Sequence, residues 1–160
     1  MGAPRFDVLG IGNAIVDILV HAEDDLLVSE GMTKGAMTLI DADEAKRLYE
    51  KIDAAMECSG GSAANTIAGL ASLGGSGAFV GKVHNDPLGD VFRHDIQAIG
   101  VSFETPPTMT GPPTATSIVL VTPDAQRTMQ TFLGASAGLG PDDIDLEQIA
   151  DAEITYLEGY

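Results

Sequence analysis

The chain has 160 residues, a length that fits one domain of ordinary size, or part of one, and that can bury a real core. It carries 8 Lys and Arg against 24 Asp and Glu, a net charge of -16, so nucleic acid and anionic membranes, which need clustered cations, are poor partners. With 44% hydrophobic and 20% charged residues the composition is globular, and the single Cys58 excludes an intrachain disulfide framework.

The first strands are predicted at the N-terminus, which has no secretory signal and so favours a cytoplasmic location. Residues 6–11 form a short apolar, β-branched run closed by Gly12, which predicts a buried strand. Residues 14–20 are also β-branched and lack helical caps, so we expect the chain to stay extended. A dinucleotide-binding loop is excluded because the third glycine of that motif would fall at Ile15 and no helix follows.

Two helices are predicted in the next part of the chain. A short strand over residues 36–40 leads to a helix that Asp41 caps and that runs to about Met56. Its apolar stripe is expected to pack on a sheet. After a glycine-rich turn, residues 63–73 are almost all small or apolar, which predicts a buried and closely packed helix. The uncharged region around it is too rich in glycine and serine to predict a transmembrane helix.

The remaining elements alternate between strand and helix until a hairpin interrupts them. Asp86, followed by a proline, is a strong helix start. The predicted elements are a strand over 78–83, a helix over 86–99, a hairpin of 115–121 and 127–133, a helix over 142–150 and a strand over 154–157.

This order of elements predicts the fold class. Strands that alternate with amphipathic helices indicate an α/β fold with a doubly wound, mostly parallel sheet covered on both faces, in three layers. Strand-only segments at about 14–40 and 115–132 interrupt the alternation. With no helix predicted to cover them, they are expected to form a small separate sheet that acts as a lid over the strand ends.

The first candidate site residue follows the first strand, where ligands of open α/β sheets bind. In an extended segment Asp17 shares its face with Ile15 and Leu19, and a carboxylate there needs hydrogen-bonding partners. The hydroxyls of a polyhydroxylated ligand would supply them. The alternative is a solvated face on which Asp17 is merely polar.

The second candidate is the glycine pair that opens the small-residue helix. Gly60 and Gly61 allow a ligand to approach the backbone, the first-turn N–H groups point outward, and Asn65 can donate and accept hydrogen bonds. This suits hydroxyls or a carbonyl better than phosphate, because no cation lies between Lys51 and Lys82. The alternative is that the glycines serve only packing.

The third candidate is Arg127, the only cation after Arg93, on the predicted hairpin. A role in binding and a merely solvated side chain fit its position equally well. The three histidines lack the spacing of metal ligands. Cys58 lies beside the glycine turn with no obvious base, and we interpret it as a bystander.

Three segments together resemble the ribokinase-like, or phosphofructokinase-B (PfkB), family of sugar and nucleoside kinases. They are Gly12-Asn13 with Asp17, the segment GGSAAN at 60–65 and the segment GKVHNDPLG at 81–89. The match runs in order along the whole chain. Residues 12–18 and 156–160 most resemble adenosine kinases and their bacterial relatives.

The resemblance implies a doubly wound α/β domain with a small β lid, and it implies a role for each matching residue. Asp17 and Asn65 would hold sugar hydroxyls. The other site residues that it implies are Asn13 lining the pocket, Gly60 and Gly61 beneath the sugar, Arg127 reaching in from the lid, and Tyr160 against a purine ring.

One departure from the family pattern limits what this chain is expected to do. Family members are considerably longer, and their Gly-Ala-Gly-Asp segment, which carries the anion hole and the general base, is absent here. The resemblance therefore implies that residues 1–160 are the N-terminal, substrate-side part of one kinase domain, inactive alone. The whole enzyme would use ATP to phosphorylate a hydroxyl of a sugar or nucleoside.

The implied partners and the competing hypothesis follow from the same comparison. ATP and Mg²⁺ would bind mainly to the part of the enzyme that this sequence lacks, and a monovalent cation is allowed. A small-molecule sugar or nucleoside is the expected partner, with a homodimer through the lid. The alternative is a non-catalytic carbohydrate-binding or nucleoside-binding module, because no general base is visible.

Overall fold

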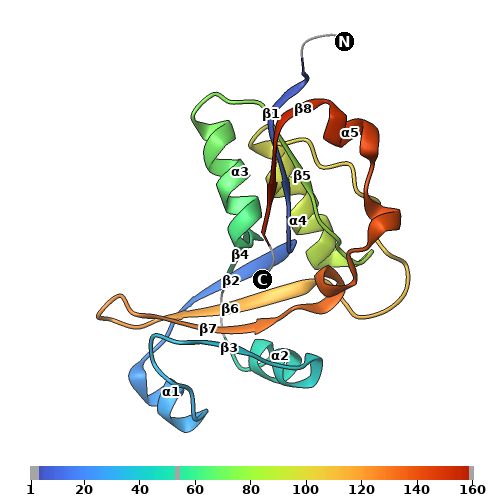
Figure 1. Cartoon of the computed structure of the whole chain (residues 1–160). Helices are drawn as coiled ribbons and strands as arrows, with labels where there is room; N and C mark the ends of the chain where they lie inside the picture. The colour runs from blue at the N-terminus through green and yellow to red at the C-terminus, as the bar shows by residue number, and fades with distance from the viewer. Residues whose placement is uncertain (1–3, 53–54, 159–160) are drawn as a thin grey trace.

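The computed structural model describes residues 4–52 and 55–158. Its body is a parallel sheet in the order β5-β1-β8 (Figure 1). These strands are β1 (Phe6–Ile11), β5 (Gly77–Val80) and β8 (Ala152–Leu157). On one face pack α3 (Ser62–Ser72) and α4 (Pro87–Ala98), and on the other lies α5 (Leu146–Ala150) with the segment before it. The predicted three-layer α/β fold is confirmed, as part of a domain.

Close contact between α3 and the body sheet explains the small residues of that helix. Ile67 is completely buried and points at the strands. A Cβ atom at Gly10 or at Gly77 would lie 2.6 Å from the Ile67 side chain. The helix therefore packs closely where two strands carry no side chain, as predicted. The prediction that this helix is buried is correct for one face only, because Asn65, Thr66 and Gly69 are exposed on the other.

The second sheet has five strands in the order β3-β7-β6-β2-β4 and lies across the end of the body where β1 ends (Figure 1). Its strands are β2 (Ile15–His21), β3 (Met37–Leu39), β4 (Met56–Gly60), β6 (Ala115–Val121) and β7 (Arg127–Phe132). We call this sheet the lid. It is mixed, because β2 pairs parallel with β6 and antiparallel with β4.

The long helix predicted to run from Asp41 to about Met56 is wrong. Asp41 does cap a helix, but α2 spans only Ala42–Tyr49, and Met56–Gly60 forms β4 on the edge of the lid. The physical reason is tertiary: β2 offers the backbone groups of Met56–Gly60 a full set of antiparallel partners, so pairing overrides the apolar stripe.

The expectation that no helix covers the lid strands is also wrong. The predicted strand-only segment 14–40 contains α1 (Asp24–Ser29), and α2 packs against β6 and β7. Helix α1 is joined to α2 by Glu30, whose carboxylate accepts hydrogen bonds from Arg47 and Lys51. The lid is thus a sheet with its own helical cover.

Several predicted boundaries were too generous. The strand predicted over 78–83 is β5 alone, and the helix predicted over 142–150 is a short 3-10 turn at Pro141–Asp143 followed by α5. None of the helices in the described part of the chain is both long and apolar enough to cross a membrane.

Asp86 joins the body to the lid, and its removal should be costly. Its carboxylate caps α4 by accepting from the Gly89 N–H (2.8 Å) and also accepts from the Thr114 N–H (2.9 Å) and Oγ1 (2.7 Å). We expect Asp86→Ala to lower the free energy of unfolding by about 2 kcal/mol, because a cap is lost and a buried N–H is left unpaired.

The matched control is Asp41→Ala, which removes one exposed capping bond, to the Glu44 N–H (2.9 Å), and should cost about 1 kcal/mol or less. Urea unfolding of both variants measures the difference. Equal losses would contradict a role for Asp86 beyond capping.

Candidate functional site

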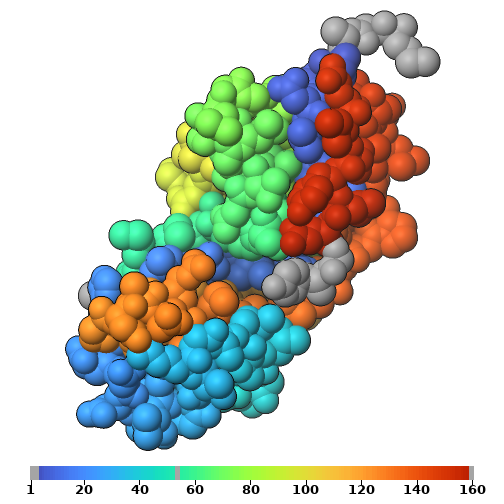
Figure 2. Space-filling model, turned by 60° about the vertical axis from the view of Figure 1, so that its left-hand side comes forward, coloured from blue at the N-terminus to red at the C-terminus, as the bar shows by residue number. Residues whose placement is uncertain are grey.

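A pocket of about 210 Å³ lies where the lid meets the N-terminal end of α3 and the end of β8. In the space-filling view α3 (green) stands over the lid strands (blue and orange) at this junction (Figure 2). The lining residues are Asn13, Ile15, Asp17, Met37, Leu39, Gly61, Ser62, Ala63, Asn65, Ser117, Arg127, Met129, Thr131, Leu133 and Glu158.

Asp17 stands in the middle of a polar row across the lid. The strand register places Asp17 opposite Cys58 on β4 and opposite Ser117 on β6, and Ser117 opposite Thr131 on β7. Cross-strand partners share one face of a sheet, so this row faces the pocket. The Ser117 and Thr131 hydroxyls hydrogen-bond each other at 3.0 Å. Val16 and Ile18, which alternate with Asp17, are buried in the core.

The Asp17 carboxylate is held without a strong partner. Burial raises its pKa to about 6, and the positive charge of Arg127 offsets part of that effect. Among the described residues no side-chain or backbone donor hydrogen-bonds the carboxylate, and the Cys58 thiol donates to the Asp17 backbone carbonyl instead, at 3.9 Å. A half-buried carboxylate of this kind gains stability from any ligand that brings donors to it.

The glycine turn fits tightly against the residues that it adjoins. Gly61 has a φ of +92°, and a Cβ there would lie 2.5 Å from the Asn13 carbonyl oxygen. A Cβ at Gly60 would lie 2.3 Å from the Asp17 carboxylate. Gly61 and Asn65 line the pocket, and Gly60 lies directly behind Asp17. Glycine is therefore required at Gly61, where the positive φ and the Asn13 carbonyl both disfavour a side chain. At Gly60 the close neighbour is the end of the Asp17 side chain, which a Cβ would displace.

Arg127 closes the far side of the pocket from β7. It lies on the same strand face as Met129 and Thr131, is exposed, and makes no ion pair within 4.0 Å with any described residue. The structure thus brings Asn13, Asp17, Gly61, Asn65 and Arg127 around one cavity. The remaining predicted site residue, Tyr160, lies outside the described residues.

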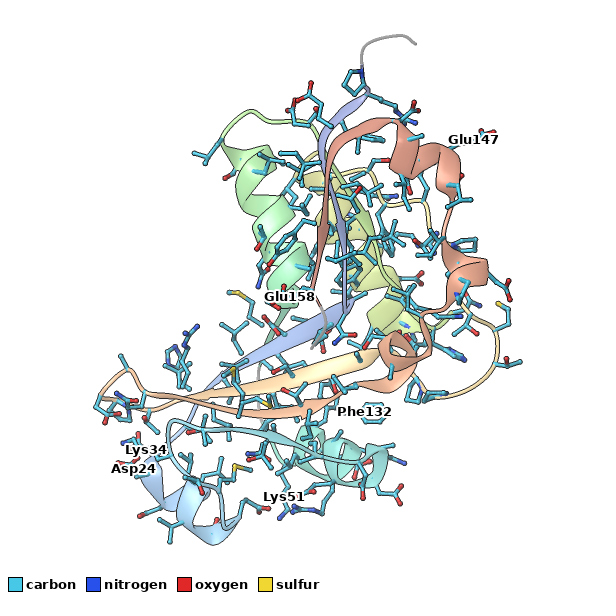
Figure 3. The ribbon with its side chains drawn as sticks, in the orientation of Figure 1. Asp24, Lys34, Lys51, Phe132, Glu147 and Glu158 are labelled. Atoms are coloured by element: carbon cyan, nitrogen blue, oxygen red, sulfur yellow. The ribbon has the colours of Figure 1, made fainter. Side chains whose placement is uncertain are left out.

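Sequence reasoning missed Glu158. It lines the pocket just after β8, where Figure 3 labels it near the lower end of α3, and the Tyr156 hydroxyl donates to its carboxylate at 3.3 Å. Its position after a predicted strand of the main sheet was a signal that could have found it.

Sequence reasoning also missed most of the apolar side of the pocket. It consists of Ile15, Met37, Leu39, Met129 and Leu133. Met37 and Met129 belong to an apolar row that lies two residues along the strands from the polar row. Every lid strand contributes one residue to this row: Met56, Leu19, Val119, Met129 and Met37. The alternation along one strand already predicted Ile15 and Leu19 on the face of Asp17. No sequence signal marks the residues of the other strands, because only the register between distant strands places them beside that face.

The pocket does not have the character of a metal site. No group of three or more His, Cys, Asp or Glu side chains in the described residues could hold a metal ion. Arg127 is the only cation among the described lining residues. These residues therefore do not fit a Mg²⁺ site, and they suit a neutral polar ligand better than a polyphosphate.

A parallel α/β body with a small sheet across the ends of its strands, and a pocket at their junction, is the ribokinase-like α/β fold. The chain belongs to the pfkB family of carbohydrate kinases, whose family model matches residues 31–160.

Curated and solved relatives agree with this assignment. A fructokinase of Salmonella typhimurium is 34% identical over 140 residues, 88% of this chain and 36% of the relative. A probable sugar kinase from Rhizobium etli and an adenosine kinase from Sinorhizobium meliloti are each 52% identical, with TM-scores of 0.91 and 0.90, over 98% of this chain and 48% of theirs. The chain thus spans about half the length of these solved relatives.

Proposed function

We propose that this chain carries the substrate-binding part and the lid of an ATP-dependent kinase, and that the substrate is a nucleoside phosphorylated on a sugar hydroxyl. The observation that supports this is a single pocket with two unlike sides. One side is polar, around Asp17 and Asn65, and the other is apolar, around Met37 and Met129.

The polar side fits the sugar. The Asp17 carboxylate accepts hydrogen bonds from two hydroxyls, and Asn65 can donate and accept at the opposite wall. The ring lies against Gly61, where no side chain intervenes, and Glu158 approaches from the body. Charge-assisted hydrogen bonds to Asp17 orient the hydroxyls.

The apolar side distinguishes a nucleoside from a bare sugar. A sugar presents hydroxyls in most directions and would leave Met37, Leu39 and Met129 facing a polar surface. A flat base buries these side chains, at about 25 cal/mol for each Å² removed from water. A sugar kinase is the second candidate, because curated relatives include fructokinases and a ribose-1-phosphate kinase from Halopiger xanaduensis.

In such a reaction the residues of this chain bind, orient and cover the substrate. Arg127, on the lid, is the cation that can approach charge developing near the substrate, and movement of the lid toward α3 would exclude water from the pocket. ATP, with Mg²⁺, supplies the transferred phosphoryl group. No residue of the described pocket is assigned as general base, so we expect this chain alone to bind without catalysing transfer.

Calorimetry with adenosine and ribose tests the proposal on the chain itself. We expect adenosine to bind about tenfold or more tightly than ribose, because only adenosine reaches the apolar side. Met129→Ala should weaken the binding of adenosine and leave the binding of ribose unchanged. The control is Met109→Ala, at a position 70% exposed and outside the pocket, which should change the affinity for neither ligand.

Equal affinities for adenosine and ribose would favour the sugar kinase, and no binding of either would contradict the proposal. Phosphorylation of a longer form of the enzyme separates a kinase from a non-catalytic binding module, the remaining alternative. The homodimer through the lid stays a prediction, which sedimentation analysis of the oligomeric state can test.

A further inference from the structure

A second cavity lies on the opposite face of the lid from the site described above. Its volume is about 160 Å³. Ile18 lines it and neighbours Asp17, and Thr116 and Ile118 line it on either side of Ser117. Because side chains alternate along a strand, β2 and β6 present one pocket on each face. We call this second pocket the rear cavity.

The walls of the rear cavity come from three parts of the fold. Helix α2 contributes Ala42, Ala45 and Tyr49, and the body contributes Leu88 from the first turn of α4. Phe132, at the end of β7 near α2, closes another side (Figure 3). The lining is almost entirely apolar. The cavity is open to solvent on one side, and its volume is close to that of enclosed apolar cavities that take up a benzene-sized ring.

Two of the four described polar residues that line this cavity, Thr114 and Tyr49, already have hydrogen-bond partners. Thr114 bonds to Asp86 through both its N–H and its hydroxyl, and the Tyr49 hydroxyl donates to Glu57 at 2.6 Å. These groups therefore hold the wall in place and do not call for a ligand.

Of the other two, Thr116 and Lys46, only Lys46 carries a charge. Its neighbours on and after α2, Arg47 and Lys51, both pair with Glu30, at 2.6 and 2.7 Å. Lys46 lines the rear cavity and has no carboxylate within 4.0 Å among the described residues, although the chain carries a net charge of -16. Lys46 is exposed, so its ammonium group can reach the mouth of the cavity, where it would favour an anion attached to an apolar body.

We propose that the rear cavity binds a small aromatic carboxylate. The ring would lie among Ile18, Ile118 and Leu88, and the carboxylate would meet the Lys46 ammonium at the mouth. The apolar walls favour an aromatic ring, the volume admits a single one, and Lys46 is the lining residue that would pair with the carboxylate.

Benzoate and the neutral benzyl alcohol are the probes, with binding followed by chemical-shift changes in the full chain. We expect saturable benzoate binding, stronger than that of benzyl alcohol. Lys46→Met keeps an apolar side chain without the charge, and it should weaken the binding of benzoate at least about fivefold, to the affinity of benzyl alcohol. Lys51→Met makes the same charge change away from the cavity and should leave benzoate binding unchanged.

Ala45→Leu tests the cavity itself. The added carbons fill the space, so both probes should lose binding while the free energy of unfolding is maintained or raised. Asp17→Asn should not affect benzoate, which distinguishes this cavity from the front pocket. Benzoate binding that survives both Lys46→Met and Ala45→Leu, or that is absent from the unmodified chain, would overturn the proposal.

Discussion

Replacing Asp17 by asparagine is expected to weaken adenosine binding about 100-fold. The substitution keeps the shape of the side chain but removes its charge and turns one acceptor into a donor. Hydrogen bonds to a charged group contribute about 1.5–3 kcal/mol each, so the loss of one to two of them corresponds to this factor. Calorimetry measures it. Asp25→Asn, at an exposed position of α1 that is not among the pocket-lining residues, is the matched control and should bind as before.

The same substitution should make the empty protein more stable at neutral pH. Burial raises the pKa of Asp17 to about 6 from an ordinary 3.8, so the folded state binds the proton more tightly than the unfolded state. The stability that this carboxyl contributes is therefore present below pH 3.8 and is lost as the pH rises through about 6. The loss by pH 7 is at most about 3 kcal/mol.

Stability and binding thus respond to pH in opposite directions. Adenosine needs the charged carboxylate, so its affinity should fall as the pH drops below about 6, where the unliganded protein gains stability. In Asp17→Asn both dependences should flatten. Identical pH profiles of unfolding for the two proteins would show that Asp17 is not held in the buried, unpaired state described above.

Gly61→Ala is expected to cost more than about 3 kcal/mol of unfolding free energy. The φ of +92° is one that L side chains rarely adopt, and the new Cβ would lie 2.5 Å from the Asn13 carbonyl oxygen. The Asn13 backbone cannot move aside as a flexible side chain can, so β2 and the start of α3 must move apart. Because both elements line the pocket, adenosine binding should also be lost.

A glycine of the same helix provides the control. Gly69 lies within α3, and a Cβ there would meet nothing within 4 Å. Gly69→Ala should therefore raise the free energy of unfolding by about 0.5–1 kcal/mol, because alanine is the better helix former. Urea unfolding of the two variants compares them directly. A Gly61→Ala protein as stable as Gly69→Ala would refute the required close approach.

Local signals were sufficient where an element is specified by its own residues. Asp86 with the following proline predicted the start of α4, and the small residues of 63–73 predicted a helix that touches the strands. Local signals failed where one segment can form either a helix or a strand. The apolar stripe that ends near Met56 is typical of a helix, yet Met56–Gly60 forms a strand because it pairs with the open edge of β2.

The chemistry of the polar side of the candidate site was readable in the same way. Asp17 follows the first predicted strand, the glycine pair opens a predicted helix, and both differ from their apolar surroundings, so they attract notice without a structure. Met37 and Met129 do not, because a methionine in a strand reads as ordinary core.

The amino-acid sequence alone determined the α/β alternation, the excess of negative charge and the polar groups available for a sugar, since each depends on residues that are neighbours along the chain. Only the tertiary structure decided that β4 joins the lid, that an apolar row borders Asp17, and that Lys46 faces a second cavity. These depend on the register between strands far apart in the chain, and a shift of one residue would turn every side chain to the other face.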